Sequence, residues 1–305
     1  MIILVSKHSL LQADFSSGAH SLITRCQATV EEWLGRVLPP RDLPPTRLHA
    51  AMYDAVFPGG RRARPLLCML IAERYGQPDD ELVCRMAAAV ELVHCASLVQ
   101  DDLPCFDDAD TRRGEPACHK VYGESTAILV GDALLTLAFE TLAAAPPRRA
   151  PAAFRLLGLL TNAAGSQHGI IGGQALELEP GVEITHYHRQ KTAALFRAAA
   201  AGAAVGCGVE NDVARWARVG ELIGCALQLR DDLDDVEGAA DDLGKPVGRD
   251  AALNRPNAAL QNGPESARAM RTALLEGINE LLGAPTAANH ALRLLVEEAT
   301  RPAKP

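Results

Sequence analysis

The sequence predicts an all-α protein, built as one large helical bundle, on three observations. Ala and Leu, both strong helix formers, dominate a chain of 305 residues that is 48% hydrophobic and only 4% aromatic. Apolar residues recur at helical spacing, as Leu82, Met86, Ala89 and Val93 do. No segment shows the strong alternation of apolar and polar residues that marks a half-buried strand. We therefore expect a single domain over residues 1–305, with roughly ten or more packed helices.

Prolines and turn residues set the expected helix limits in order along the chain. A first helix over about residues 19–37 precedes the break "LPPRDLPPT", and a second begins near Thr46 as N-cap. A long apolar helix is expected over residues 81–102. Later breaks are expected over 143–151, over 179–185 with Thr185 as cap, and over 208–215 with Asn211 or Asp212 as cap. We expect about 18 residues at the N-terminus and about five at the C-terminus to be disordered.

Charge and cysteine content exclude several classes of protein. The net charge is −8 and the pI about 5.6, which argues against nucleic-acid binding because such proteins usually carry a basic stripe. The eight cysteines include no C-x-x-C pair and several lie in apolar runs, so we expect reduced thiols and a cytoplasmic protein. No uncharged apolar run reaches about 18 residues, so no membrane-spanning helix is expected.

A first acidic cluster closes the apolar helix, in "LVQDDLPCFDDADTRRGEP" over residues 98–116. Asp101 and Asp102 end the helix, and Pro104 disfavours helical geometry at the residue before it. The chain can then fold back and bring Asp107 to the same place. Taken alone, the cluster could also be a solvated acidic helix end.

A second acidic cluster lies in "QLRDDLDDVEG" over residues 228–238. Asp231 and Asp235 share a helix face at i and i+4, with Asp232 adjacent, so their like charges repel unless a cation compensates them. Mg²⁺ binds through few carboxylates and keeps room for water and phosphate oxygens. The two clusters together therefore suggest several Mg²⁺ ions that bridge an anionic ligand above an apolar core.

Cationic side chains flank both clusters, as an anionic ligand would require. Guanidinium groups can bind phosphate oxygens bidentately, and lysine acts as a point charge. The cations are Arg61, Arg62 and Arg64 in "GGRRARP", Arg112 and Arg113 after the first cluster, Lys191 beside Thr192 in "QKTAALF", and Lys245 and Arg249 after the second cluster.

These blocks resemble the trans-isoprenyl diphosphate synthase family, which includes farnesyl and geranylgeranyl diphosphate synthases. "DDLPCFD" is similar to the first aspartate-rich motif of the family and "DDLDD" to the second. "GGRRARP", "RRGEPACH", "GGQALEL", "KTAALF" and "LGKPVG" resemble its other blocks, in the family's order, over roughly residues 45–255. The resemblance implies the isoprenoid synthase fold, a helical bundle around a deep central cavity, and a homodimer.

The resemblance also implies roles for individual residues. Three Mg²⁺ ions, or Mn²⁺ in their place, would be held directly or through water by Asp101, Asp102, Asp107, Asp231, Asp232 and Asp235. The allylic diphosphate would be bound by Arg112, Lys191, Thr192, Gln228 and Lys245, with Lys191 and the aspartates as the catalytic set. Isopentenyl diphosphate would be bound by Arg61, Arg64, His94 and Arg113. For His94, a core-edge histidine satisfied by the backbone is the alternative.

Four positions depart from the family pattern. Position 61 is Arg where Lys is usual, Glu177 replaces an Asp, Leu227 stands where Phe often precedes Gln, and Asn257 stands where a Thr is usual. Arg255 keeps a cation two residues before that position. The expected activity is head-to-tail condensation of isopentenyl diphosphate with dimethylallyl, geranyl or farnesyl diphosphate, by ionisation, condensation and proton loss.

Product length should depend on the helix that carries the first cluster. Ser97 lies one turn before Asp101 on a similar face, and Ala96 is the neighbouring position that the family uses as part of the floor of the prenyl pocket. Both are small, so the pocket should admit more than fifteen carbons, which favours geranylgeranyl over farnesyl diphosphate as product. Residues 125–139 could still close the floor.

Three other functions fit parts of the sequence less well. A non-catalytic subunit of a prenyl synthase usually lacks one aspartate motif, whereas both are present here. A terpene cyclase has no need of the second set of cations at Arg61, Arg64 and Arg113. A di-iron bundle could use the Glu-x-x-His pairs at 91–94 and 183–186, but it leaves the aspartates and arginines unexplained.

Overall fold

A computed structural model of the chain confirms the predicted all-α class. It describes residues 7–57, 59–77, 79–238, 248–253 and 255–301, without the side chains of residues 7–17 and 249. Within these ranges the strands are limited to a two-residue antiparallel pair, β1 (Thr111–Arg112) and β2 (Glu115–Pro116). The α-helices are α1 (Lys7–Val37), α2 (Thr46–Val56), α3 (Ala63–Arg74), α4 (Glu81–Asp101), α5 (Cys118–Tyr122), α6 (Glu124–Ala143), α7 (Ala150–Ala164), α8 (Ile170–Leu176), α9 (Ile184–His188), α10 (Ala194–Gly206), α11 (Val213–Glu237), α13 (Arg249–Ala252), α14 (Ala258–Asn262), α15 (Pro264–Leu282) and α16 (Ala287–Thr300). The short 3₁₀ or π turns are η1 (Pro147–Arg149), η2 (Arg189–Ala193) and η3 (Glu210–Asp212).

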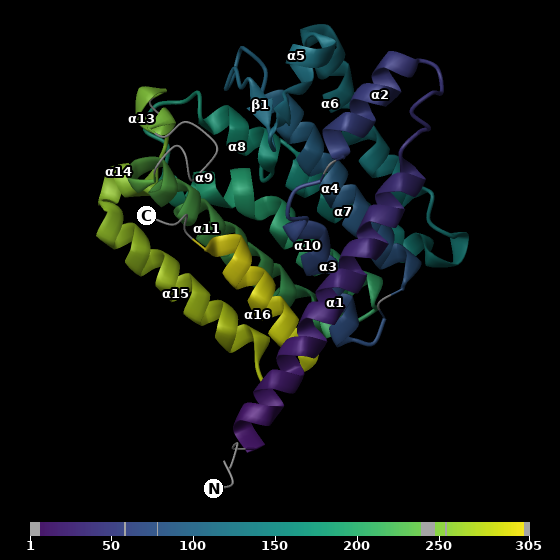
Figure 1. Cartoon of the computed structure of the whole chain (residues 1–305), viewed down its shortest axis with the longest axis vertical. Coiled ribbons are helices and arrows are strands. Elements are labelled where there is room, and N and C mark those ends of the chain that lie inside the picture. Colours follow the sequence, from purple (N-terminus) through teal and green to yellow (C-terminus); the bar gives the residue numbers. More distant parts are fainter. Residues whose placement is uncertain (1–6, 58, 78, 239–247, 254, 302–305) are drawn as a thin grey trace, which may run out of the picture.

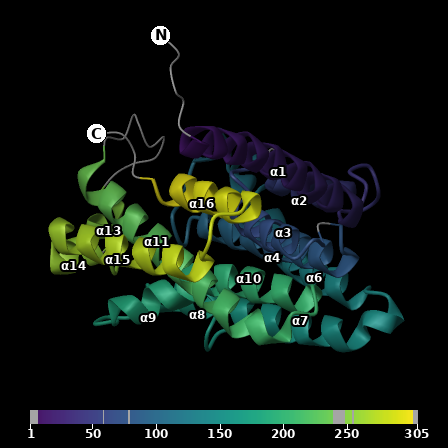
Figure 2. The ribbon, with the colours of Figure 1, turned by 90° about the horizontal axis from the view of Figure 1, so that it is seen from below.

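Helices α4 and α10 form the centre of the bundle, because their side chains are apolar nearly all round. Every residue of α10 except Arg197 is buried, as such an all-apolar helix requires. Helix α4 packs against α3, α6 and α10, and α10 packs against α7 and α11. Long α1 crosses one face of the molecule near α16, while α7, α8 and α9 lie on the opposite face (Figures 1 and 2).

The helix ends agree with the sequence in most places, and the differences have local causes. Helix α1 already includes residues 7–18, which precede its expected start. Thr46 is the first residue of α2, after an N-cap at Pro45. Glu183, in place of Thr185, caps α9, because its carboxylate accepts the backbone N–H groups of Thr185 and His186 at 2.9 and 2.8 Å.

Within the described part of the chain, two helices are long and apolar enough to span a membrane when judged by length and composition alone. In the apolar windows of α4 and α6, 78% and 39% of the residues are buried inside the protein. Core helices pass the same test, and α4 and α6 pack against each other here. This feature is therefore weak evidence for a membrane protein, although α6 keeps an exposed apolar face.

Candidate active site

The end of α4 turns back on itself and brings Asp107 to Asp101, as the sequence predicts. The backbone N–H of Asp107 donates to the carbonyl of Asp101 at 2.9 Å, and that of Ala109 donates to the carbonyl of Asp102 at 3.2 Å. Burial raises the pKa of Asp101 to about 6; nearby Lys191 opposes this shift, and the charges of Glu177 and Asp107 add to it. Carboxylates that repel one another in this way form a favourable place for a divalent cation.

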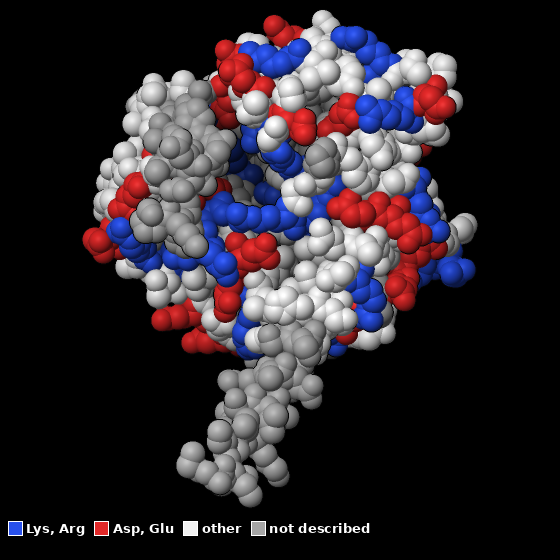
Figure 3. All heavy atoms as spheres, viewed as in Figure 1, with Lys and Arg blue, Asp and Glu red and all other residues white. Residues whose placement is uncertain are grey.

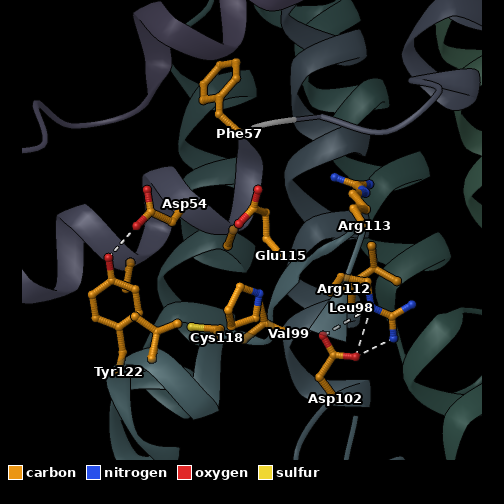
Figure 4. Close-up of a pocket in the computed structure, with 14 residues that line it drawn as sticks. Asp54, Phe57, Leu98, Val99, Asp102, Arg112, Arg113, Glu115, Cys118 and Tyr122 are labelled. Atoms are coloured by element: carbon orange, nitrogen blue, oxygen red, sulfur yellow. Dashed lines mark hydrogen bonds and ion pairs between the residues drawn. The ribbon is translucent and has the colours of Figure 1, made fainter. Parts of the chain in front are cut away.

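Asp102 faces away from this pair and toward β1. It is 2% exposed and accepts hydrogen bonds from Arg112, at 3.0 Å for Nε to Oδ1. Asp102 and Arg112 line a cavity of about 270 Å³, together with Leu98 and Val99 of α4 (Figure 4). Arg112 is therefore paired with a carboxylate in this structure. Asp102 follows Asp101 in the chain, but its side chain is paired with Arg112 and does not join Asp101 and Asp107.

The second acidic cluster divides between the cleft and the core. Asp231 is partly exposed and pairs with Arg230. Asp232 is fully buried: it accepts the backbone N–H of Ala258 at 2.8 Å and the amide of Gln228 at 3.0 Å, and it lies 3.0 Å from His188 Nε2. Asp232 thus ties α11 to α9 and α14, and the structure does not bring it to the cleft beside Asp231.

Asp235 and Asn257 complete this side. Asp235 is 8% exposed, and it accepts the backbone N–H of Asp250 at 3.2 Å. Asn257 is fully buried and caps α14 by accepting the N–H groups of Ala259 and Leu260 at 2.9 and 3.0 Å. Its amide also donates to Asp250 at 2.8 Å and to the carbonyl of Asp232 at 3.1 Å. The threonine that is usual in the family has no side-chain amide and could not make these two bonds in this way.

Glu177 joins the two sides of the cleft. Its side chain contacts Lys191 and the hydroxyl of Tyr187, and it lies 3.7 Å from Nε of Arg255. Arg255 in turn contacts Asp107 in the first cluster. The buried carboxylate of Glu177 therefore holds two cations beside the first acidic cluster. The sequence analysis noted only that a Glu replaces the family's Asp at this position and did not predict this role.

Lys191 and Thr192 lie in the π turn η2, an irregularity that often marks a functional site. Thr192 donates its hydroxyl to Gln228 of α11. Helix α8 approaches this turn so closely that a Cβ on Gly173 would lie 2.3 Å from the backbone N of Lys191. The glycines of "GGQALEL" therefore allow backbone contact that fixes where Lys191 points.

A second group of cations surrounds a cavity of about 200 Å³, which we call the cation pocket. Among the described residues, its lining includes Arg61, Arg64, His94, Arg113 and Arg230 with one carboxylate, Glu91. Arg64 Nε is buried and has no hydrogen-bond partner among the described residues, and burial lowers the pKa of Arg64 to about 10. Burial and the surrounding arginines also hold the pKa of His94 well below its usual value, so His94 is neutral. An orphaned guanidinium among several cations fits a polyanion.

The apolar pocket lies on the other side of Asp101. It has a volume of about 510 Å³, with Asp101, Gln174 and Lys191 among its polar lining residues. Its apolar walls come from Leu103, Phe106, Ile128, Leu135, Ile170, Ile171, Ala175 and Leu178. Ser97 lines this pocket, whereas Ala96 is 3% exposed and is not part of the lining.

The space-filling view shows how these parts share one face. Lys and Arg side chains gather inside a hollow, and carboxylates lie around it (Figure 3). Lys245 lies outside the described residues, so its predicted contact with the allylic diphosphate stays a prediction. Sequence reasoning did not place Tyr187 or Arg230 in the site, and it considered Glu91 only as part of a Glu-x-x-His pair. Tyr187 lies at helical spacing, four residues before Lys191, whereas Arg230 only precedes Asp231 in the chain.

Comparisons with known proteins agree with this geometry. The polyprenyl synthetase family model matches residues 45–295. A geranylgeranyl diphosphate synthase of Cereibacter sphaeroides is 44% identical over 223 residues, which cover 73% of this chain and 77% of that protein. The enzyme of the same name from Rhodobacter capsulatus is 43% identical over 241 residues, 78% of this chain and 83% of that protein.

Solved structures give the same result for the fold. The apo crystal structure of an FPP/GFPP synthase from Zymomonas mobilis has a TM-score of 0.76 and 29% identity, and covers 92% of this chain and 99% of that chain. A geranyltransferase from Helicobacter pylori, complexed with magnesium and isoprenyl diphosphate, has a TM-score of 0.75 and 26% identity, over 90% and 96% of the two chains. The chain therefore belongs to the polyprenyl synthetase family of trans-prenyltransferases.

Proposed function

We propose that this protein condenses isopentenyl diphosphate with an allylic diphosphate and releases geranylgeranyl diphosphate. The observation that carries the proposal is the placement of two distinct anion sites beside one apolar pocket. The cation pocket holds Arg61, Arg64 and Arg113, while Lys191 and Asp101 sit at the mouth of the apolar pocket. A terpene cyclase would need only one diphosphate site, and a non-catalytic subunit would need neither.

The donors present fit Mg²⁺. The candidate ligands are carboxylates, and Mg²⁺ takes few protein carboxylates and completes its shell with water and phosphate oxygens. Asp101 and Asp107 would hold ions on one side and Asp231 on the other, with Asp235 behind it. When bound, Mg²⁺ supplies charge neutralisation at the diphosphate oxygens. Up to three ions, or Mn²⁺, are proposed from the family resemblance.

The chain's own residues would orient both substrates. Lys191 and Thr192 on the η2 turn, with Gln228 of α11, would hold the allylic diphosphate, and Arg112 and Arg255 would add charge from the first cluster. The apolar pocket would take the prenyl tail and exclude water from the reacting carbons. Catalysis then consists of positioning and electrostatic stabilisation.

The bond changes balance without a protein nucleophile. The allylic C–O bond breaks, and its electron pair leaves with the diphosphate. The double bond of isopentenyl diphosphate attacks the allylic cation, and a C–C bond forms. A proton is then lost from the adjacent carbon, and the released diphosphate accepts it.

Geranylgeranyl diphosphate is the proposed product because small Ser97 leaves the apolar pocket open beside α4. The names of the relatives from Cereibacter sphaeroides and Rhodobacter capsulatus support the same product. Farnesyl diphosphate is the alternative, because Ile128 and Leu135 of α6 also line the pocket and could close its far end.

We also propose a homodimer in the cytoplasm. Helix α6 and the adjoining α5 expose apolar side chains, with Val121, Ile128 and Leu129 at 52%, 50% and 55% exposure, and such patches commonly mark interfaces. All eight cysteines are free and five are buried, which fits a reducing compartment.

Product analysis tests the proposal. Purified protein is incubated with Mg²⁺, isopentenyl diphosphate and each allylic primer in turn, and the products are sized after dephosphorylation. We expect a twenty-carbon alcohol from every primer accepted. A fifteen-carbon product would favour the alternative, and no condensation with any primer would refute the proposed function.

A further inference from the structure

Two arginines in unusual backbone conformations converge on Glu91 of α4. Arg62 has φ of 50° and Arg113 has φ of 56°, in the left-handed region that side chains other than glycine rarely adopt. Arg62 Nη1 donates to Glu91 Oε1 at 2.8 Å, and Arg113 Nη2 lies 3.8 Å from the same oxygen. Left-handed arginines at two separate turns, both aimed at one carboxylate, indicate that the surrounding structure enforces this contact.

The loop before α3 leaves room for both guanidinium groups. A Cβ on Gly59 would lie 2.3 Å from Cζ of Arg62, and a Cβ on Gly60 would lie 2.9 Å from Nε of Arg113. The two glycines of "GGRRARP" therefore serve two different arginines, one in the same loop and one in the β1–β2 turn. The loop, the turn and α4 meet at Glu91.

The arrangement gives the two arginines different tasks. Arg62 is 2% exposed and donates four hydrogen bonds, because it also donates to Glu31 at 2.9 and 3.1 Å and to the carbonyl of Val56 at 2.8 Å. Arg113 keeps 21% of its side chain exposed in the cation pocket. Glu91 is 1% exposed and is the one carboxylate among the described residues that line the cation pocket. Arg62 and Arg113 together offset the charges of Glu31 and Glu91, so Glu91 can hold Arg113 in place without adding a net negative charge to the cation pocket.

We propose that Glu91 is a positioning residue that fixes the guanidinium of Arg113 for the diphosphate of isopentenyl diphosphate. The inference rests on the proposed function and assigns a role to a residue that does not itself contact substrate. It implies that Glu91 governs one substrate only, because Lys191 and the aspartates at the allylic site lie outside the cation pocket.

Steady-state kinetics with Glu91→Gln test this role. We expect the KM for isopentenyl diphosphate to rise about tenfold, the KM for the allylic primer to stay within twofold, and kcat at saturation to change little. Glu31→Gln is the matched control, because Glu31 also binds Arg62 but lies outside the cation pocket; its KM for isopentenyl diphosphate should match wild type.

A double variant distinguishes positioning from general disruption. If Glu91 acts through Arg113, then Glu91→Gln with Arg113→Ala should raise that KM no further than Arg113→Ala alone. Additive effects, equal rises in both KM values, or an unchanged KM in Glu91→Gln would each overturn the inference. If Glu91→Gln does not fold, Glu91→Asp decides, since it keeps the carboxylate but withdraws it from Arg113 by one methylene: the same selective rise supports the inference, and no rise overturns it.

A binding measurement separates this inference from the proposed function. Isopentenyl diphosphate is titrated calorimetrically into wild type and Glu91→Gln in EDTA, where only the metal-independent cation pocket should bind it. Weaker binding by the variant supports the positioning role even if no primer is turned over. Equal binding, or no binding by wild type, overturns it.

Discussion

Replacing Asn257 should measure how much its buried side-chain amide, beside the second acidic cluster, contributes to the free energy of unfolding. Asn257→Ala removes the cap of α14 and the donor to Asp250. Loss of an N-cap costs about 1 kcal/mol. Loss of the two hydrogen bonds that the amide donates, to the Asp250 carboxylate and to the Asp232 carbonyl, costs about 2 kcal/mol together. The free energy of unfolding should therefore fall by about 3 kcal/mol, a hundredfold change in the folding equilibrium.

Asn257→Ser provides the matched variant. A serine oxygen can still cap α14, but it has no amide to donate to Asp250 and to the carbonyl of Asp232. We expect its loss of stability to be about 2 kcal/mol, so it should lie between wild type and Asn257→Ala.

Urea unfolding at one fixed protein concentration measures both variants, because assembly would make the midpoint depend on concentration. The midpoint should order as wild type above Asn257→Ser above Asn257→Ala, with unchanged slopes. An Asn257→Ala midpoint indistinguishable from wild type would refute the reasoning. Equal losses in the two variants would show that the cap itself contributes nothing.

Four further outcomes can be measured directly. Asp101→Ala or Asp231→Ala should each lower turnover by roughly 10³-fold with the far-UV helical signal intact, and wild-type turnover in both would exclude a metal role. Ser97→Phe should shorten the product by about one prenyl unit, since a helical turn of about 5.4 Å is close to the length of that unit. Product sizing should show a weaker effect for Ala96→Phe, because Ala96 does not line the apolar pocket. Leu129→Glu should convert a dimer to a monomer in light scattering, because it places a charge on the apolar face of α6. Mg²⁺ and diphosphate together should raise the melting temperature by more than the sum of their separate shifts, and strictly additive shifts would count against a shared site.

The sequence predicted those features that depend on local rules. Composition and helical periodicity were enough for the all-α class, and Pro104 after the aspartate pair was enough for the turn that brings Asp107 to Asp101. Asp101 and Asp107 therefore needed no tertiary information. The start of α1 was harder to place, because residue types that commonly cap helices, such as Asp14, Ser16 and Ser17, lie inside it.

Features that depend on tertiary contacts could not be predicted in the same way. Asp232 was grouped with its neighbours by residue type, but on a helix it points about 100° away from Asp231, toward the side that α14 covers. In the sequence, Glu91 is one residue of an apolar helix, in a Glu-x-x-His spacing. Its proposed role depends on contacts with two arginines from separate turns, Arg62 and Arg113, and spacing along one helix cannot predict such contacts. Spacing reveals which residues share a face of one helix, and it does not reveal what covers that face.

The charges at the cleft explain why so many aspartates and cations can coexist in an apolar protein. Arg112 pairs with Asp102, Lys191 with Glu177, and Arg255 with Asp107. These pairs reduce the electrostatic cost of partly buried charges. A diphosphate that drew one of these cations away would free its carboxylate for a divalent ion. Each ligand would then remove a competitor of the other, so the pairing would couple metal and diphosphate binding reciprocally.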